Sequence, residues 1–290
     1  CVFCGNHLHM GRGIRHHSVE YIIEHMKYLN KNYCVTHFHI EDDNLNANIK
    51  RFENLIDNIL QLPFKVTWDA SNGVRGDLLA NESLLGKIKK SGCNYLKIAV
   101  ESGDQEVVNR VVKKNINLEK VKKTAEFCKK IKMDLHAFYI IGFVGETLNQ
   151  IENTINFAKF MQRRLNVFPH MQIAEPIKGT ELYYLAKEKN YLLYNPSGTY
   201  PYSISTPEFN EDLLRRKYLN PFMRYSKYLL SKFVITNANL RALSSSLSFF
   251  IKINKCLPFL SIKEKLYKTM LSKTMYVHTN NLRCWKEFFR

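Results

Sequence analysis

Two cysteines and an aromatic residue open the chain, as Cys1, Phe3 and Cys4. The short spacer lets both thiolates face one centre, which suits a metal ion, an iron–sulfur cluster or a redox pair. A zinc ion would be completed by His7 and His9, which follow on the same stretch. The cysteines by themselves leave these alternatives open.

Further polar and glycine-rich clusters recur along the chain, each directly after an apolar stretch. They occupy residues 41–44, 72–75, 101–104, 142–147 and 176–180. Carboxylates in such clusters suit a cationic ligand, and glycines let the backbone approach a ligand closely. The clusters can act together only if the fold brings them to one place.

Periodicity in the apolar residues predicts alternating helices and strands. The helices are expected at 19–29 after Ser18, at 49–59, after Asn81 with Gly92 closing the helix, and around 118–128 and 151–158. The strands are expected at 35–40, 64–68, 95–100, 136–141 and 171–174. Every polar cluster then follows a strand.

Strands that alternate with helices every ~30 residues indicate right-handed βαβ units and a parallel sheet or barrel. We predict an α/β fold, a partial (β/α)6 TIM-like barrel, with its chemistry at the carboxyl ends of the strands. Because the chain opens on a loop and a helix, we expect the first strand of the barrel to precede residue 1.

Beyond about residue 190 the alternation of strands and helices stops. We predict a barrel domain at 1–192 and a helical C-terminal extension at 193–290, with 191–207 loop-like and helices from 209 onward. The extension is expected to pack on the barrel. Peripheral membrane contact through amphipathic helices is the alternative.

Composition limits the partners and the compartment that are expected for the protein. The net charge is +17, but the lysines are interspersed along the chain, which favours a solvated surface over a nucleic-acid site. Seven cysteines without a dense framework indicate a reducing compartment, so we expect a cytoplasmic protein. No apolar run is long enough to predict a transmembrane helix.

In order and spacing, these clusters resemble the signatures of the radical S-adenosylmethionine (SAM) enzymes, most closely the branch with a cobalamin-binding domain. The resemblance covers residues 1 to about 192. Cys1, Phe3 and Cys4 are similar to the end of that family's Cys-x-x-x-Cys-x-aromatic-Cys motif. The family's first cysteine would lie upstream of residue 1. With two of three ligands, residues 1–290 alone are not expected to hold a normal cluster.

The resemblance implies a four-iron four-sulfur cluster, SAM and cobalamin as cofactors. Cys1 and Cys4 would ligate the cluster, leaving one iron open to SAM. Phe3 would shield the cluster beside the adenine. Glu41 and Asp42 would bind the SAM ammonium group.

Other SAM contacts implied by the resemblance lie on the later clusters. Glu101 and Ser102 would hold the ribose hydroxyls or the methionine carboxylate. Asn72 and Arg75 would hold that carboxylate or the substrate. Gly142 would let the backbone approach the adenine against Ile141.

Each cluster also has a purely structural interpretation. Asp43 or Asn44 would cap the following helix, as would Asp104 and Thr147 in their clusters. Asn72 and the glycine after it would form no more than a turn.

The resulting hypothesis is an enzyme that reductively cleaves SAM to a 5′-deoxyadenosyl radical, for cobalamin-dependent methylation or for cyclisation. Its substrate would be a small or lipid-like molecule, and flavodoxin or ferredoxin would donate the electron. Cobalamin would come from an upstream domain. The alternatives are a tRNA methylthiotransferase and a degenerate barrel that only binds a partner.

Overall fold

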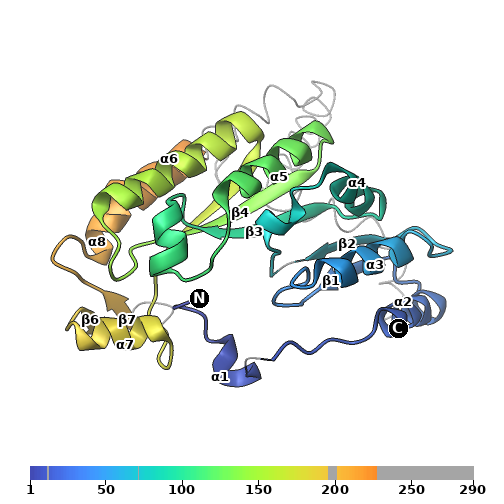
Figure 1. Cartoon of the computed structure of the whole chain (residues 1–290), viewed down its shortest axis with the longest axis horizontal. Helices are drawn as coiled ribbons and strands as arrows, with labels where there is room; N and C mark the ends of the chain where they lie inside the picture. The colour runs from blue at the N-terminus through green and yellow to red at the C-terminus, as the bar shows by residue number, and fades with distance from the viewer. Residues whose placement is uncertain (12, 71, 195–200, 227–290) are drawn as a thin grey trace, which may run out of the picture. The chain divides into compact units, whose positions relative to one another are not determined.

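The computed structural model describes residues 1–11, 13–70, 72–194 and 201–226. The chain divides into two compact units, Cys1–Leu229 and Leu230–Arg290, and all described residues lie in the first. The predicted tail after residue 226 lies outside them, so the domain boundary at 192 stays a prediction. Figure 1 shows the elements.

Five parallel strands follow one another in the order of the sequence (Figure 1). They are β1 (His37–Ile40), β2 (Thr67–Ala70), β3 (Tyr95–Glu101), β4 (Asp134–Ile141) and β5 (Val167–Ile173). β1 pairs with β2, and β3, β4 and β5 pair in series. Parallel bridges from Trp68 to Cys93 and from Val74 to Ile98 join the two sets. This confirms the predicted α/β class, whereas completion of a six-stranded barrel stays a prediction.

Helices connect these strands, as the periodicity predicted. They are α1 (Asn6–Met10), α2 (Val19–Tyr33), α3 (Ile49–Ile59), α4 (Glu82–Lys90), α5 (Leu118–Lys130), α6 (Leu148–Leu165), α7 (Glu181–Glu188) and α8 (Glu211–Leu214), with the short turns η1 (Gly76–Leu79), η2 (Val107–Val111) and η3 (Arg215–Leu219). Figure 1 shows α5 and α6 lying side by side along β4.

Helices begin directly after residues whose side chains can cap them. Asp104 accepts hydrogen bonds from the backbone of residues 106 and 107, and Thr147 forms a capping box with Gln150, both as predicted. The cap of α3 is Asn48, which accepts from the Arg51 N–H, so the expectation of Asp43 or Asn44 is wrong. Those two residues lie too far upstream to reach the first helical amides.

The stretch predicted to be loop-like at 191–207 contains a small antiparallel hairpin. Its strands are β6 (Leu192–Tyr194) and β7 (Tyr202–Ile204). The turn-forming residues of this stretch favoured a loop, so these two short strands were not predicted. Among the described helices, none is long and apolar enough to cross a membrane.

Side chains alternate between the two faces of the sheet. Leu96, Ile98 and Val100 of β3 are fully buried, as expected for the face that the helices cover. The opposite face of β3 carries Tyr95 and Lys97, which are only half-buried. The same face continues across β4 and β5 with residues of mixed aromatic and basic character, namely His136, Phe138, Phe168 and His170.

Candidate functional site

The N-terminal turn holds both predicted cluster ligands. The Cys4 N–H approaches the Cys1 carbonyl oxygen at 3.4 Å, so the two cysteines share one turn. Val2, 2% exposed, anchors it: its N–H donates to the Val112 carbonyl at 3.0 Å, and its carbonyl accepts from the Leu182 N–H at 2.8 Å. Cys1 is exposed and Cys4 is half-buried, so both thiols remain accessible to a ligand.

Phe3 connects this turn to the cluster that follows β4. Its ring lies 5.7 Å from that of Phe143, which is fully buried. Gly142, the residue before, has φ +89°, a backbone conformation that favours glycine, and a Cβ there would lie 2.4 Å from the flexible end of the Leu214 side chain. Ile141 and Gly142 are both buried, so the predicted contact of the adenine with the backbone there stays a prediction.

The cysteines and histidines of the zinc alternative are not assembled into a site. Among the residues that the structure describes, the one group of three potential metal ligands in close contact is His37, His39 and Asp69.

The turn after β4 is held by an acidic side chain that the sequence analysis did not select. Glu146 is 3% exposed, and its Oε2 accepts from the N–H groups of Gly142 at 2.7 Å and Phe143 at 3.1 Å. Burial raises the pKa of its carboxyl to about 8, although both amide donors act in the opposite direction. At neutral pH the carboxyl is therefore largely protonated.

Glu41 and Asp42 are exposed where β1 ends. The side-chain amide of Asn72, from the end of β2, donates to the Glu41 carbonyl at 2.9 Å. This bond ties the two strand ends together and leaves both carboxylates at the surface. The predicted ammonium contact is thus compatible with the fold and stays a prediction.

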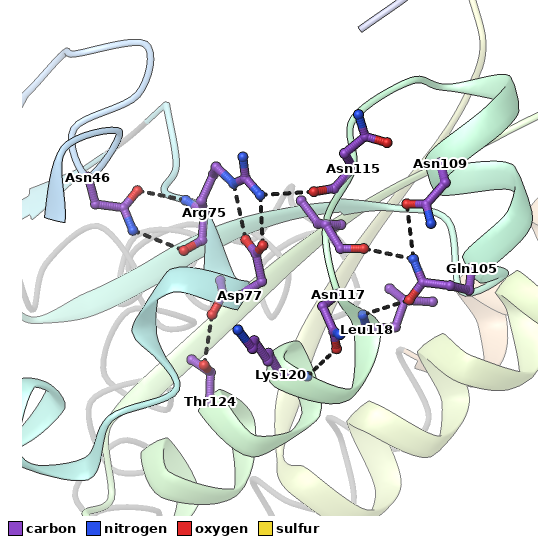
Figure 2. Close-up of polar contacts among 12 residues, drawn as sticks. Asn46, Arg75, Asp77, Gln105, Asn109, Asn115, Asn117, Leu118, Lys120 and Thr124 are labelled. Atoms are coloured by element: carbon purple, nitrogen blue, oxygen red, sulfur yellow. Dashed lines mark hydrogen bonds and ion pairs between the residues drawn. The ribbon is translucent and has the colours of Figure 1, made fainter.

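Arg75 lies in a network of contacts with the chain itself (Figure 2). Asn46, which is fully buried, brackets its backbone, accepting from the Arg75 N–H at 2.8 Å and donating to the carbonyl at 2.9 Å. The guanidinium makes a two-pronged contact with Asp77, at 3.1 and 2.7 Å, and donates to the Asn115 carbonyl at 3.1 Å. In this arrangement Arg75 braces the loop after β2, and its predicted contact with a ligand carboxylate stays untested.

Figure 2 also shows how this network reaches α5. Gln105 donates to the Asn109 side chain and accepts from the Leu118 N–H, which fixes the start of α5. Thr124, further along α5, donates to the Gly76 carbonyl at 2.7 Å. The loop after β2 is thereby attached to a helix far along the chain.

Glu101 and Ser102 stand at a backbone irregularity. The pairing of β3 with β4 shifts register between Ala99 and Glu101, and Glu101 has φ +67°, a conformation that favours glycine. Its carboxylate pairs with Lys114 at 2.6 Å, and both side chains are largely buried. Ser102 is fully buried and shares a hydrogen bond of 2.7 Å with Thr154 of α6.

Strain of this kind is typical of functional sites. The structure nevertheless gives Glu101 and Ser102 internal partners, so their proposed contacts with SAM stay predictions.

Several residues of the site could not be found from the sequence. Asn46 and Lys114 act through partners 29 and 13 residues away, at positions set only by the fold, whereas Asp77 pairs with Arg75 two residues before it. Glu146 was visible in the cluster at 142–147, but nothing in the spacing marks it as buried.

The matched part of the chain identifies a protein family. A model described as the radical SAM superfamily matches residues 1–158, more than half of the chain. The matched range includes the N-terminal turn and the first four polar clusters.

Curated relatives are methyltransferases and a cyclase. The chain is 31% identical over 194 residues to an uncharacterised methyltransferase of Pyrococcus horikoshii, covering 67% of this chain and 40% of the relative. It is 27% identical over 188 residues to cytidylyl-2-hydroxyethylphosphonate methyltransferase of Streptomyces wedmorensis, with 63% and 34% covered. The anaerobic magnesium-protoporphyrin IX monomethyl ester cyclase of Rubrivivax gelatinosus is 23% identical over 159 residues, with 55% and 28% covered. The chain thus spans well under half the length of these relatives.

Solved structures share the fold. The radical SAM methyltransferase TsrM of Kitasatospora setae, with cobalamin and a [4Fe-4S] cluster bound, superposes with a TM-score of 0.50 at 14% identity, covering 66% of this chain and 38% of that one. OxsB, a cobalamin-dependent SAM radical enzyme, gives a TM-score of 0.55 at 15% identity, covering 94% and 44%. At these identities the likeness concerns the fold alone.

Proposed function

Because the chain belongs to the radical SAM superfamily, we propose that the protein containing it methylates an unactivated position of a small or lipid-like substrate, with cobalamin as methyl carrier. The observation that carries this proposal is the pairing of the Cys1–Cys4 turn with the turn after β4 through Phe3 and Phe143. Methyltransferases among the relatives support methylation, and the cobalamin-bound fold relatives support that cofactor.

The full architecture in this proposal is a six-stranded partial barrel whose first strand and first cluster cysteine come from upstream of residue 1. Residues beyond the barrel form a helical extension. An upstream domain supplies cobalamin, and flavodoxin or ferredoxin supplies the electron.

When bound, a four-iron four-sulfur cluster supplies the electron that cleaves SAM to methionine and a 5′-deoxyadenosyl radical. Cys1 and Cys4 contribute two of its ligands in this proposal. Glu41 and Asp42 attract the SAM ammonium group, and the backbone at Gly142 lies against the adenine. The helices that cover β3 to β5 keep water away from one face of the site.

The test uses the full-length protein, reconstituted anaerobically with iron and sulfide, with and without cobalamin. We expect methyl transfer from labelled SAM to an acceptor, together with S-adenosylhomocysteine, only when cobalamin is present. Formation of 5′-deoxyadenosine without cobalamin would instead indicate cyclisation or another radical reaction, to which the cyclase relative also points. Absence of both products would refute the proposal.

A matched pair of cysteine variants locates the cluster. Cys4→Ser removes a thiol from the N-terminal turn, whereas Cys34→Ser removes an exposed thiol at the end of α2. We expect cluster iron and SAM cleavage to be lost in Cys4→Ser and retained in Cys34→Ser. Equal loss in both variants would show that the turn is not the cluster site.

A further inference from the structure

A second group of potential ligands lies on β1 and β2, away from the N-terminal turn. His37 and His39 alternate along β1 and so lie on one face of it. Parallel pairing sets Thr67 beside His37 and Asp69 beside His39 on the neighbouring strand. Three different side chains therefore converge, and their potential ligand atoms all lie within 4.8 Å of one another.

One separation in this group matches that between two ligands of one metal ion, and the other has the length of a hydrogen bond. His37 Nε2 lies 3.4 Å from Asp69 Oδ2, and His39 Nδ1 lies 2.9 Å from the same oxygen. Nitrogen and oxygen ligands at ~2.0–2.1 Å from a tetrahedral zinc ion lie about 3.3 Å apart. The 3.4 Å separation is longer than the ~2.7–2.9 Å of a charge-assisted hydrogen bond.

A further contact orients His37. Its Nδ1 lies 2.8 Å from Thr67 Oγ1, so the hydroxyl can accept the Nδ1 proton. In that tautomer the Nε2 lone pair faces the Asp69 carboxylate, an arrangement that a cation between them would stabilise. Metal-bound histidines are commonly oriented in this way by a partner on the other ring nitrogen.

Burial of the Asp69 side chain also favours a cation at this position. The Asp69 side chain is 1% exposed. Burial and, next, the negative charge of Asp69 raise the pKa values of the nearby Cys93 thiol and Tyr95 phenol. A buried carboxylate is stable when it is paired or bound to a metal. The His39 side chain is 59% exposed, which leaves one side of the group open to solvent.

We propose that His37, His39 and Asp69 bind a divalent transition-metal ion such as zinc, with a fourth position open to water or another oxygen ligand. Two imidazoles and one carboxylate are a common ligand set for such ions when a coordination position stays free. Thr67 acts as a positioning residue through His37. This site is separate from the cysteine turn and does not depend on the proposed methylation.

Cobalt is a suitable probe, because its visible spectrum distinguishes nitrogen and oxygen ligands from thiolates. The full-length protein carrying Cys1→Ser and Cys4→Ser, stripped with a chelator, is titrated with Co²⁺ in the absence of oxygen. We expect one equivalent to bind without thiolate charge-transfer bands and to be displaced by Zn²⁺. Failure to bind at equimolar concentration would overturn the proposal and leave a proton shared between histidine and aspartate.

Substitutions in the same background identify the ligands. We expect His39→Ala and Asp69→Asn to abolish the cobalt spectrum, and Thr67→Val to weaken binding by about 10–100-fold with all three ligands in place. His25→Ala, an exposed histidine on α2, is the matched control and should bind as the parent does. Circular dichroism shows whether each variant folds. If Asp69→Asn unfolds, the cobalt affinity of Thr67→Val tests the site in its place. Unchanged affinity in Thr67→Val or an unchanged spectrum in His39→Ala would overturn the proposal.

Discussion

Single residues hold the turns of this site in place, and Glu146 is the clearest case. One carboxyl oxygen accepts both turn amides, and the other has no hydrogen-bond partner among the described residues. A neutral acid satisfies the amides without the cost of a buried charge. Loss of that proton, or of the partner of a buried charge, should therefore change the stability of the protein.

Glu146 should make stability depend on pH. Its pKa rises from the usual 4.5 to about 8 on folding, so the folded state holds the proton more tightly. Its contribution is then fully present below pH 4.5 and is lost as the pH rises toward 8. We expect Glu146→Gln to remove this loss, measured as urea unfolding between pH 5 and 8. Parallel curves for the variant and the native protein would contradict the protonated turn.

The pair formed by Glu101 and Lys114 is buried, so each charge depends on the other. Lys114→Met leaves the carboxylate of Glu101 without its cation and should cost about 3–5 kcal/mol in the free energy of unfolding. Adding Glu101→Gln should recover most of that loss. Lys27→Met breaks an exposed pair with Glu24 and should cost less than about 1 kcal/mol. Equal costs for Lys114→Met and Lys27→Met would contradict this account.

Among the elements, adjacent strands place titratable side chains on the open face of the sheet. His136 of β4 lies 2.9 Å from His170 of β5, between Nδ1 and Nε2. Burial, then the charges of His170 and Lys97, lower the pKa of His136 to about 4. One imidazole can donate to the other only when at least one of them is neutral.

This pair should destabilise the protein in acid. The pKa of His136 is lowered on folding from 6.5, so its contribution is present above pH 6.5 and is lost as the pH falls toward 4. We expect His136→Phe to flatten the pH dependence of the thermal midpoint across that window, with His25→Phe on the exposed face of α2 as control. A flattening of equal size in both variants would contradict the role of the pair.

Elements were largely predictable because each carries local signals. Asn81, Asp104 and Thr147 cap helices where the sequence placed them, since capping depends on amides only two or three residues away. His37 and His39 carry no such local signal. Their proximity to Asp69 depends on strand pairing across thirty residues, which periodicity does not encode.

In the molecule as a whole, the bond from Asn72 to the Glu41 carbonyl and the contact of Phe3 with Phe143 join polar clusters that lie far apart in sequence. The alternation of strands and helices did not predict the partners inside each cluster. Arg75 was expected to face a ligand, and in the fold it contacts Asn46 and Asn115 from distant parts of the chain and the neighbouring Asp77. Such contacts form only once the strands are in register. Sequence spacing therefore predicts at which end of the strands the site lies and does not predict the side-chain contacts within it.

Contact between Phe3 and Phe143 joins the N-terminal turn to the turn after β4, and this link should matter to cofactor binding more than to folding. Phe143→Leu keeps most of the buried apolar volume and should cost less than about 1.5 kcal/mol in stability. It removes the ring that lies 5.7 Å from Phe3.

We therefore expect reconstituted full-length Phe143→Leu to bind SAM more weakly, measured by equilibrium dialysis, at nearly native thermal stability. Phe52→Leu removes an equally buried ring from α3, away from the cysteine turn, and is the matched control. If both variants bind SAM as the native protein does, the two turns act independently. Weaker binding in Phe143→Leu alone would show that a packing contact between distant parts of the chain holds the SAM site together.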